Sequence, residues 1–396
     1  MRILHLSHGT LPDWRIEKCA LSASTKLGYE AIFAGLAPIV SHTRESSFSK
    51  IYKIDWTEGA KFGIPFYWHF VKKQLSIVLG ESRPDIVHAH NIFAAKMISE
   101  FGIPFVFDDH EYTSVYVRGL TEQVKKNPYV SALETNSHLR SFKNAAWKVL
   151  LKNRSVGLWT KWERELLSLS KPTIVTTQKV AEDLRIRYDH RNTNADRIFI
   201  VPNLPMESEA QGFGNPIYHD RVSSVYAGAD RFYSAGVYAH RDLDGLADIF
   251  INYDIGNLVM IGVNRPKSDS FSPPNIEFVE FLPRRCMYNE MFKHSIGLMA
   301  FRKHWSHPFK SPNKAYEYAH AGLFVMCTSS FSSVIESFKG NCGVFEDYAE
   351  LAAQLEYYRD NPEDLYKKRI KSFDYAKKNL IWENYEDNIF RAYQLA

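Results

Sequence analysis

Cysteine is scarce in this sequence, and the few cysteines present do not form a motif. The four of them, Cys19, Cys286, Cys327 and Cys342, include no Cys-x-x-Cys pair. Structural zinc sites and disulfide-stabilised secreted domains need more cysteines at closer spacings. We therefore expect no zinc site, and reduced thiols in a cytoplasmic protein.

Long apolar runs and a strong net charge are absent as well. The longest stretch without a charged residue, 318–335, contains a histidine, a threonine and four serines, so it does not match a bilayer-spanning helix. The first residues, MRILHLSHG, lack the long apolar core of a signal peptide. The net charge of +4 gives no reason to expect a nucleic-acid partner.

The sequence does contain a regular alternation of short apolar strands and helical segments. Its 396 residues allow two or three domains at about 150 residues each. Strands separated by helices of 10–15 residues predict parallel sheets with βαβ crossovers. The alternation stops at 202–221, which contains three Pro and two Gly, and resumes at 225. We expect an α/β fold with two doubly wound domains, 1–205 and 206–379, that face a cleft and bind ligands at the C-terminal ends of their strands.

Polar residues follow the first strands of the sequence. Gly9 comes directly after the first strand, where a glycine lets backbone N–H groups approach a phosphate or a sugar. A plain turn is an equal alternative. The segment PDIVHAHN (84–91) places two histidines on one face of a strand. We interpret His88 as a core residue and His90, closer to the loop, as a candidate for the lining of the cleft.

A second polar cluster follows the strand in FVFDDHEY (105–112). The segment brings Asp108, Asp109, His110 and Glu111 to the end of a strand, where α/β sheets place functional groups. Capping of a helix by Asp109 is one alternative. A metal site is another, although the ligand spacing is not diagnostic.

The segment 310–328 carries the clearest candidate for an anion site. Pro312 favours the start of a helix, and Lys314 and Glu317 then lie one turn apart on the same face. A helix N-terminus attracts anions, so together with Lys314 it predicts a diphosphate site, and Glu317 can accept hydrogen bonds from ribose hydroxyls. A surface ion pair between Lys314 and Glu317 is the alternative.

Over nearly its whole length the chain resembles the GT-B glycosyltransferases of the retaining family 4 (glycosyl transferases group 1). The matching segments, in chain order, are 13–15, 26–29, PDIVHAHN (84–91), FDDHE (107–111), VPN (201–203), VYAG (225–228), FVEFLP (278–283), IGL (296–298), PNKAYEY (312–318) and WE (382–383). The resemblance implies two Rossmann-like domains, with the C-terminal helix, 380–396, completing the first. It departs from the family at Phe309, where a glutamate is usual, at Ala229, where an arginine is usual, and at Glu280, where a glycine is usual.

The resemblance also implies roles for individual residues. Lys314, with Arg231 or Arg241, would neutralise the diphosphate of a nucleotide-sugar, Glu317 would hold the ribose, and His110 would contact the donor sugar. The expected donor-binding set is completed by Gly9, Gly228, Leu282 and Asn313. The expected acceptor-binding residues are Asp13, Arg15, His90 and Glu111. GT-B enzymes use cationic side chains at the diphosphate, so neither an essential metal nor a cofactor is expected.

Two other functions fit the same resemblance. A nucleotide-sugar 2-epimerase would share the fold and need no acceptor, and a non-catalytic sugar-binding relative would explain Phe309.

One further partner is suggested by charge. Residues 118–171 contain eleven Lys and Arg against four Glu, a local charge of +7, with Trp147, Trp159 and Trp162 among them. This pattern indicates peripheral binding to an anionic membrane surface, with a solvated helix and buried tryptophans as the alternative.

Overall fold

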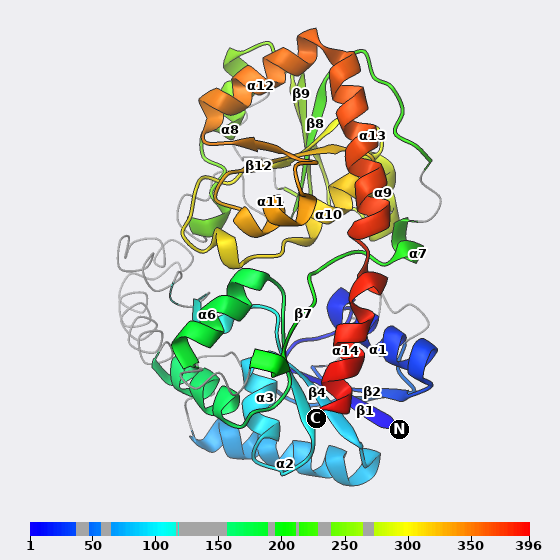
Figure 1. Cartoon of the computed structure of the whole chain (residues 1–396), viewed down its shortest axis with the longest axis vertical. Coiled ribbons are helices and arrows are strands. Elements are labelled where there is room, and N and C mark those ends of the chain that lie inside the picture. The colour runs from blue at the N-terminus through cyan, green and yellow to red at the C-terminus, as the bar shows by residue number, and fades with distance from the viewer. Residues whose placement is uncertain are drawn as a thin grey trace, which may run out of the picture. The chain divides into compact units, whose positions relative to one another are not determined.

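A computed structural model describes residues 1–36, 47–56, 65–115, 118, 157–188, 195–210, 214–228, 239–263 and 273–396. The chain divides into two compact units (Figure 1). The N-terminal unit comprises Met1–Pro202 and Tyr385–Ala396, and the C-terminal unit comprises Asn203–Asn384. Each unit is built around one parallel sheet with helices between its strands, as the alternation in the sequence predicts.

The sheet of the N-terminal unit has the order β3-β2-β1-β4-β5-β6-β7, and all neighbouring strands are parallel. The chain adds strands on one side of β1 and then continues on the other side, so the winding reverses between β1 and β4. Ligands of such sheets bind at this switch point, beyond the C-terminal strand ends. The strands are β1 (Arg2–Ser7), β2 (Glu30–Gly35), β3 (Lys50–Lys53), β4 (Ile86–His90), β5 (Phe105–Asp109), β6 (Thr173–Val175) and β7 (Ile198–Ile200).

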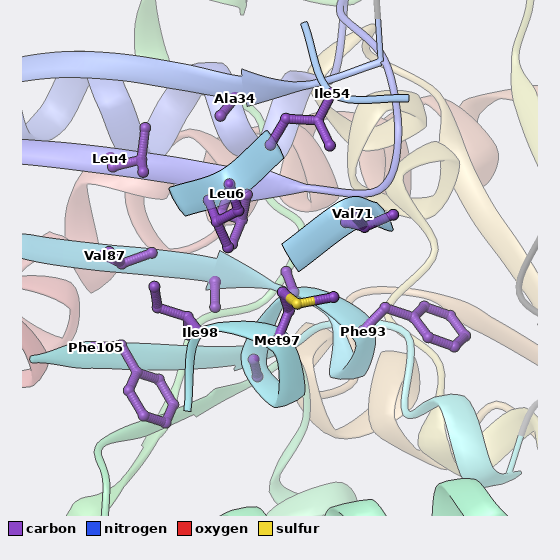
Figure 2. Packing of buried hydrophobic residues seen from close by; sticks show 14 of the residues in the cluster. Leu4, Leu6, Ala34, Ile54, Val71, Val87, Phe93, Met97, Ile98 and Phe105 are labelled. Carbon is purple, nitrogen blue, oxygen red and sulfur yellow. The ribbon is translucent and has the colours of Figure 1, made fainter. Parts of the chain in front are cut away.

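The two faces of this sheet differ in what they bury. Successive side chains of a strand point to opposite faces. Leu4 and Leu6 of β1 therefore share one face, and their apolar cluster includes residues of α2 (Pro65–Ser82) and α3 (Ile92–Ile98) (Figure 2). On the other face lie α1 (Trp14–Leu27) and α14 (Glu386–Gln394), which contact each other. The other described helical segments of this unit include 157–168, α6 (Gln178–Tyr188) and the 3₁₀ turn Ala195–Arg197.

The ends of α1 follow the local sequence closely. Asp13 is the N-cap, and its carboxylate accepts hydrogen bonds from the N–H groups of Arg15 (3.0 Å) and Ile16 (3.1 Å). Gly28 ends the helix with a φ of 65°, a left-handed conformation that glycine adopts without strain. Gly28 is therefore the C-cap of α1.

The sheet of the C-terminal unit has the order β10-β9-β8-β11-β12-β13, again entirely parallel. Its switch point lies between β8 and β11. The strands are β8 (Ser223–Ala227), β9 (Asn257–Ile261), β10 (Ile276–Val279), β11 (Ile296–Met299), β12 (Phe324–Thr328) and β13 (Gly343–Phe345). The helices are α7 (Glu207–Ala210), η5 (Ala239–Arg241), α8 (Leu246–Asn252), α9 (Arg284–Met291), η6 (His307–Phe309), α10 (Asn313–His320), α11 (Ser332–Phe338), α12 (Tyr348–Asp360), α13 (Pro362–Asn379) and η7 (Trp382–Tyr385).

Helix α10 lies directly on β11, and Gly297 permits this close approach. A Cβ atom at position 297 would lie 2.4 Å from the ring of Tyr318, so no larger residue fits. The hydroxyl of Tyr318 accepts a hydrogen bond from the N–H of Ala227 at 2.7 Å, at the end of β8. This packing holds the start of α10 near the switch point of the sheet.

The basic segment 118–171 is described only at 118 and from 157 onward, and Trp147 lies outside the described residues. Trp159 and Trp162 belong to the apolar cluster of the N-terminal unit, where each is 7% exposed. The prediction that these two tryptophans face a membrane is therefore wrong, because they fill the core beside Phe93. Among the described ranges, no helix combines the length and apolar character needed to cross a membrane.

Candidate functional site

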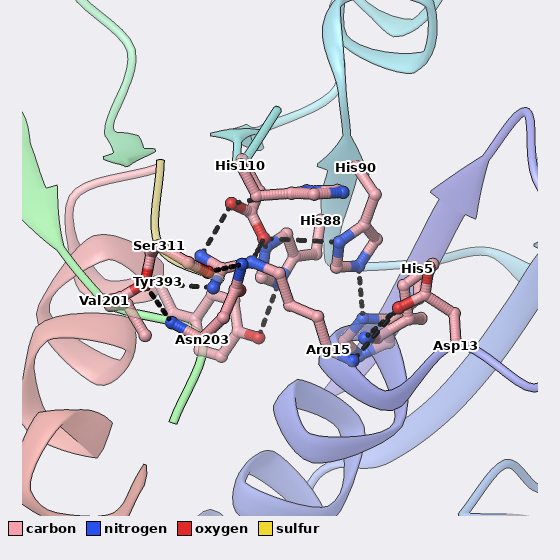
Figure 3. A network of polar contacts seen from close by, with 12 residues as sticks. His5, Asp13, Arg15, His88, His90, His110, Val201, Asn203, Ser311 and Tyr393 are labelled. Carbon is pink, nitrogen blue, oxygen red and sulfur yellow. Dashed lines mark hydrogen bonds and ion pairs between the residues drawn. The ribbon is translucent and has the colours of Figure 1, made fainter. Parts of the chain in front are cut away.

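A row of polar side chains crosses the face of the N-terminal sheet that α1 and α14 cover (Figure 3). Strand pairing aligns His5 with His88 and His90 with Asp108. Because paired residues and residues two apart point to the same face, all four side chains meet there. All four are fully buried. Asp109, one residue further along β5, points to the opposite face, where burial and the nearby Glu163 raise its pKa well above the usual value.

Arg15 of α1 reaches this row and binds Asp108 at two points. Its Nε lies 2.8 Å from Oδ2 and its Nη2 lies 2.9 Å from Oδ1, while Nη1 donates to the carbonyl of Val201 at 2.9 Å. Burial alone would raise the pKa of Asp108, but the charge of Arg15 and hydrogen bonds from His110, His88 and His90 together hold that pKa well below its usual range. Arg15 was predicted to contact an acceptor. Its burial, at 6% exposure, favours a role in positioning Asp108.

The three buried histidines are held as neutral imidazoles. Burial lowers the pKa of His5, His88 and His90, most strongly for His5 and His90. Nδ1 of His5 lies 3.0 Å from Nε2 of His90, and Nδ1 of His88 lies 2.9 Å from the hydroxyl of Tyr393 in α14. His90 was also predicted to contact an acceptor. The alternation of β4 places it inside the unit instead, so it is corrected to a core residue.

His110 differs from these histidines because it follows the end of β5. Its side chain is 14% exposed, and its Nδ1 lies 3.7 Å from Oδ1 of Asp108. Burial lowers the pKa of His110, but the interaction with the Asp108 carboxylate prevails and the net pKa is raised. Asp108 therefore favours the protonated form of His110, at the C-terminal edge of the sheet.

The other predicted residues of this unit lie around the same edge. Asp13 uses its carboxylate to cap α1, and Glu111 is exposed. The N–H of Gly9 donates to the hydroxyl of Ser7 at 3.0 Å, so this amide has a partner within its own turn. Sequence reasoning did not select His8 and Asn91, which lie 2.5 Å apart (Nδ1 to Nδ2) at the switch point between β1 and β4.

The histidines, Asp108 and Cys19 also form three groups whose potential metal-ligand atoms lie within 4.8 Å of one another. Two of these groups include Asp108, whose carboxylate already binds the Arg15 guanidinium. The third joins His5, His88 and His90, but the His88 and His90 rings stack at 4.2 Å with an angle of 17°. An imidazole nitrogen binds a metal in the plane of its ring, and two nearly parallel rings do not share a point in both planes. These residues fit a metal poorly, and the absence of an essential metal stays a prediction.

In the C-terminal unit, Lys314 lies in the first turn of α10 and points to the switch point of the sheet. Its Nζ donates to the hydroxyl of Tyr226 at 2.8 Å. The same atom lies 4.1 Å from the centroid of the Tyr226 ring, at the end of β8, and 5.1 Å from that of Phe301, just after β11. Asn313, the first residue of α10, is exposed. Lys314 is thus a preplaced cation at the position where such sheets bind ligands.

Glu317, one turn further along α10, pairs with Arg284 and not with Lys314. Oε1 of Glu317 lies 2.6 Å from Nη1 of Arg284, whose Nε donates to Glu209 at 2.6 Å. The alternative of a Lys314–Glu317 surface pair is therefore wrong. Burial lowers the pKa of Arg284, but the interactions with Glu317, Tyr288 and Glu209 together outweigh burial and the net pKa is raised. Arg284 begins α9, two residues after the half-buried Leu282, and Phe281 beside it is 73% exposed.

A basic and histidine-rich cluster lies at the same end of this sheet, and sequence reasoning recognised only Arg241 of it. Nε2 of His307 lies 2.8 Å from the carbonyl oxygen of His240, and its ring stacks on Phe331 at 4.0 Å. Burial, with the positive charges of Lys310 and Arg241, lowers the pKa of His240 to about 3. Burial also lowers the pKa of His307 to about 3. The local potential is therefore positive.

The arginine alternatives and Gly228 were also predicted to bind the donor. Arg231 lies outside the described residues, so Arg241 is the one of the two alternatives that the structure places. Gly228 directly follows β8, and its N–H donates to the carbonyl of Ile261 at 3.0 Å. That amide extends the pairing between β8 and β9 and has no need of a ligand.

No model of a known protein family matches the sequence, and no curated protein does. Solved structures match the whole chain. Sucrose-phosphate synthase from Thermosynechococcus elongatus is 10% identical, with a TM-score of 0.69 over 99% of this chain and 98% of that protein. The chain has the GT-B fold. Two further solved structures also match: Anabaena HepE in complex with UDP-glucose (11% identity, TM-score 0.60, 100% and 99% covered) and a putative UDP-N-acetylglucosamine 2-epimerase from Listeria monocytogenes (12%, 0.55, 99% and 95%).

Identities this low carry the fold and not the reaction. Within the GT-B fold of this chain, the two switch points hold different chemistry. The N-terminal one carries His110, whose pKa is raised by a buried carboxylate, and the C-terminal one carries Lys314 in a basic cluster. The C-terminal site is suited to a polyanion, and the N-terminal site to hydrogen bonding with a hydroxyl group.

Proposed function

We propose that the protein is a retaining glycosyltransferase that moves a sugar from a nucleotide-sugar donor to a glycan, lipid-linked or small-molecule acceptor. The observation that carries this proposal is Lys314 at the start of α10, beside the switch point between β8 and β11. The positive potential that Lys310 and Arg241 impose at His240 supports it. A nucleotide-sugar offers the diphosphate that such a cluster binds best.

In the proposed reaction, the bond between the anomeric carbon and the diphosphate oxygen breaks, and its electron pair stays on the diphosphate. Lys314, with Arg241, stabilises the negative charge that grows on this leaving group. Fixed cations lower the barrier because they interact more strongly with the transition state than with the ground state. The acceptor hydroxyl attacks from the face that the diphosphate leaves and gives its proton to a diphosphate oxygen, so the anomeric configuration is retained.

The nucleoside half of the donor is assigned to the α9–α10 edge. Oε1 of Glu317 is held by Arg284, and we assign Oε2 to the ribose hydroxyls. Arg284 also binds Glu209, so the carboxylate of Glu317 is fixed before the donor arrives. Phe281 and Leu282 precede this pair in the chain, and an exposed aromatic ring there is suited to stacking on a base. Asn313 and Gly228, the residue that directly follows β8, complete the proposed donor set.

His110 is assigned to the transferred sugar. Its raised pKa makes it a hydrogen-bond donor near neutral pH, and Asp108 maintains that state. A donor hydrogen bond to a sugar hydroxyl positions the ring while positive charge develops at the anomeric carbon. Glu111 and Asp13, which lie outside the buried row, remain the proposed acceptor contacts, and Arg15 acts through Asp108.

One assay series separates the proposed reaction from its alternatives. The full chain is incubated with UDP-, GDP- and ADP-sugars, with and without a mixture of sugar acceptors, and products are followed by mass spectrometry. A transferase gives nucleoside diphosphate and a glycosylated acceptor. A 2-epimerase, the activity for which the putative Listeria protein is named, changes the sugar without an acceptor. A non-catalytic protein gives neither product, but the bound nucleotide still raises its Tm.

We also propose that segment 118–171 binds an anionic membrane surface through its Lys and Arg side chains, without insertion of Trp159 or Trp162. Attraction between exposed charges acts within about a Debye length, so it weakens with salt. The test is co-sedimentation with vesicles of neutral phosphatidylcholine and with vesicles that also contain phosphatidylserine. Recovery on the anionic vesicles alone, lost at high salt, supports the proposal. Equal recovery on both lipids, or none on either, contradicts it.

A further inference from the structure

Segment 110–114, which follows β5 and carries His110, is bound by a carboxylate from a distant helix. Glu163 lies in the helical segment 157–168 and is 0% exposed. Its Oε1 accepts a hydrogen bond from the backbone N–H of Ser114 at 3.1 Å, and its Oε2 accepts one from the hydroxyl of Ser114 at 2.7 Å. Ser114 is buried as well. One side chain therefore binds both the backbone and the side chain of a residue that precedes it by 49 positions.

Tyr112 gives the same segment a second anchor. Its side chain is 1% exposed, and its hydroxyl donates to Oδ2 of Asp183 in α6. Nε of Arg187 lies 2.8 Å from the same oxygen, so the acceptor is itself held in place. The φ of Tyr112 is 48°, a left-handed conformation that a residue with a side chain keeps only where the surrounding contacts impose it. The backbone just beyond His110 is therefore fixed by buried contacts.

These anchors matter for His110 because the strand before it has already ended. Asp109 is the last residue of β5, where it pairs with Val175 of β6, so His110 is the first residue beyond the ladder. Nδ1 of His110 lies 3.7 Å from Oδ1 of Asp108. The sheet holds the backbone of His110 on one side only. On the other side, the distance between the ring and Asp108 depends on the segment that Glu163 binds.

We propose that Glu163 is a positioning residue that fixes segment 110–114 through Ser114, and so sets the place of the His110 ring relative to Asp108 and to the transferred sugar. Glu163 acts through the backbone and is not assigned a contact with substrate. The part that concerns the sugar rests on the proposed function. The part that concerns Asp108 and His110 is a property of the N-terminal unit alone and holds whatever the reaction is.

The surroundings of Glu163 show which substitution keeps its contacts. Its Oε2 also accepts a hydrogen bond from the hydroxyl of Tyr188 in α6 at 3.1 Å. Burial raises the pKa of Glu163 to about 7, although the hydrogen bonds from Ser114 and Tyr188 oppose this. The nearby Asp109 also has a raised pKa, through burial and the charge of Glu163. A neutral amide therefore suits this site: in Glu163→Gln the amide oxygen can accept from the N–H of Ser114, and the amide nitrogen can donate to its hydroxyl.

Two hydroxyls donate to the same oxygen of Glu163, and they provide a matched pair of variants. Ser114→Ala removes the donor that belongs to segment 110–114. Tyr188→Phe removes the donor that belongs to α6 and leaves both contacts with Ser114 in place. Glu163→Met removes the acceptor for all three hydrogen bonds and keeps a side chain of similar size. A positioning role predicts that His110 responds to the loss of the Ser114 contacts and not to the loss of the Tyr188 contact.

The direct test is the titration of His110, followed by NMR in the full chain labelled at its histidines, with the signal assigned from His110→Gln. The Asp108 carboxylate raises the pKa of His110, so this pKa reports how close the ring lies to it. We expect Glu163→Met to move the pKa of His110 toward its ordinary value of about 6.5, and Ser114→Ala to move it less far in the same direction. Tyr188→Phe and Glu163→Gln should keep the wild-type value.

Two results of this titration would overturn the proposal. One is a wild-type pKa of His110 in Glu163→Met, or in Ser114→Ala if Glu163→Met does not fold. The other is an equal shift in Ser114→Ala and Tyr188→Phe, which would mean that any loss from the cluster disturbs His110.

Transfer kinetics test the part that rests on the proposed function. Misplacement of a catalytic group by about 1 Å can cost about 10²-fold in rate, so Glu163→Met should lower kcat about ten- to hundredfold. The KM for the donor should stay near its wild-type value, because the nucleoside diphosphate is assigned to the C-terminal unit, and Glu163→Gln should restore kcat. A raised KM with an unchanged kcat would overturn the role at the sugar. If the wild-type chain transfers no sugar, the proposed function fails, and the titration of His110 still decides whether Glu163 positions that ring.

Discussion

The guanidinium of Arg15 binds the carboxylate of Asp108 through two contacts, of 2.8 and 2.9 Å, although 93 residues separate them in the chain. Arg15 is 6% exposed and Asp108 is 0% exposed. Asp108 in turn raises the pKa of His110. The Arg15–Asp108 pair therefore links the packing of α1 on the sheet to the protonation of His110, which follows the end of β5.

Replacement of Arg15 should destabilise the protein strongly. Arg15→Met leaves Asp108 as a buried carboxylate without its cation, and breaking a buried ion pair in this way costs about 3–5 kcal/mol. The free energy of unfolding is measured by urea denaturation. Arg2→Met is the matched control, because the Arg2–Glu30 pair is exposed and its loss should cost less than about 1 kcal/mol. A similar, small effect for both variants would contradict the importance of the buried pair.

Stability should fall when the solution is made acidic. The pKa of His5 in the folded state lies below its unfolded value of about 6.5. The stability that neutral His5 contributes is therefore fully present above about pH 6.5 and is lost as the pH falls through the lowered pKa. His5→Leu removes the group that takes up this proton. The free energy of unfolding of the variant should therefore fall less steeply with decreasing pH than that of the wild type, by about 1.4 kcal/mol per pH unit. Urea denaturation between pH 5 and 8 measures the slope. The exposed His69, changed to Leu, is the control. A wild-type slope in His5→Leu would show that His5 titrates normally.

The rate of transfer should fall as the pH rises through the raised pKa of His110. The protonated ring is the proposed donor to the sugar, and Asp108 stabilises that form. Asp108→Asn should move the fall in kcat to lower pH, because the neutral amide no longer favours the cation. His110→Gln, which retains an N–H donor that does not titrate, should remove the fall. An unchanged pH profile in Asp108→Asn would exclude this coupling.

Glu317→Gln should weaken donor binding more than it slows the reaction. Ribose contacts are made equally in the ground and transition states, so their loss raises KM and leaves kcat near its wild-type value. Steady-state kinetics with varied donor measures both constants. Glu336→Gln, on the neighbouring helix α11, is a matched substitution outside the Arg284 pair. A large drop in kcat with an unchanged KM would place Glu317 at the transferred sugar instead.

The sequence predicted the architecture well because it depends on local signals. Apolar segments such as 86–90 and 324–328 became strands, and Gly28 ends α1 as its position suggested. Lys314 was placed correctly at a helix start because Pro312 marks the boundary. Such features depend on residues a few positions apart, which a single sequence displays directly.

The partners of the site residues could not be predicted in the same way. Arg15 meets Asp108 because α1 packs on the face to which β5 directs that carboxylate, and this depends on strand register across the whole sheet. Glu317 meets Arg284 because α9 and α10 come together after separate crossovers. His90 was also misjudged: it was a candidate for the lining of the cleft because it lies near the end of its strand, but its side chain is fully buried.

The most direct test of the account is donor turnover by Lys314→Ala. Removal of one preorganised charge donor costs about 10²–10³-fold in rate, and Lys314 is a cation at the switch point of the C-terminal unit, where we propose that the donor binds. Lys293→Ala, at an exposed pair with Glu290, controls for the loss of a charge elsewhere in the same unit. We predict a loss of about 10²–10³-fold for Lys314→Ala, an unchanged rate for Lys293→Ala, and similar Tm values for both. Wild-type turnover in folded Lys314→Ala would contradict the central claim that this lysine stabilises the leaving diphosphate.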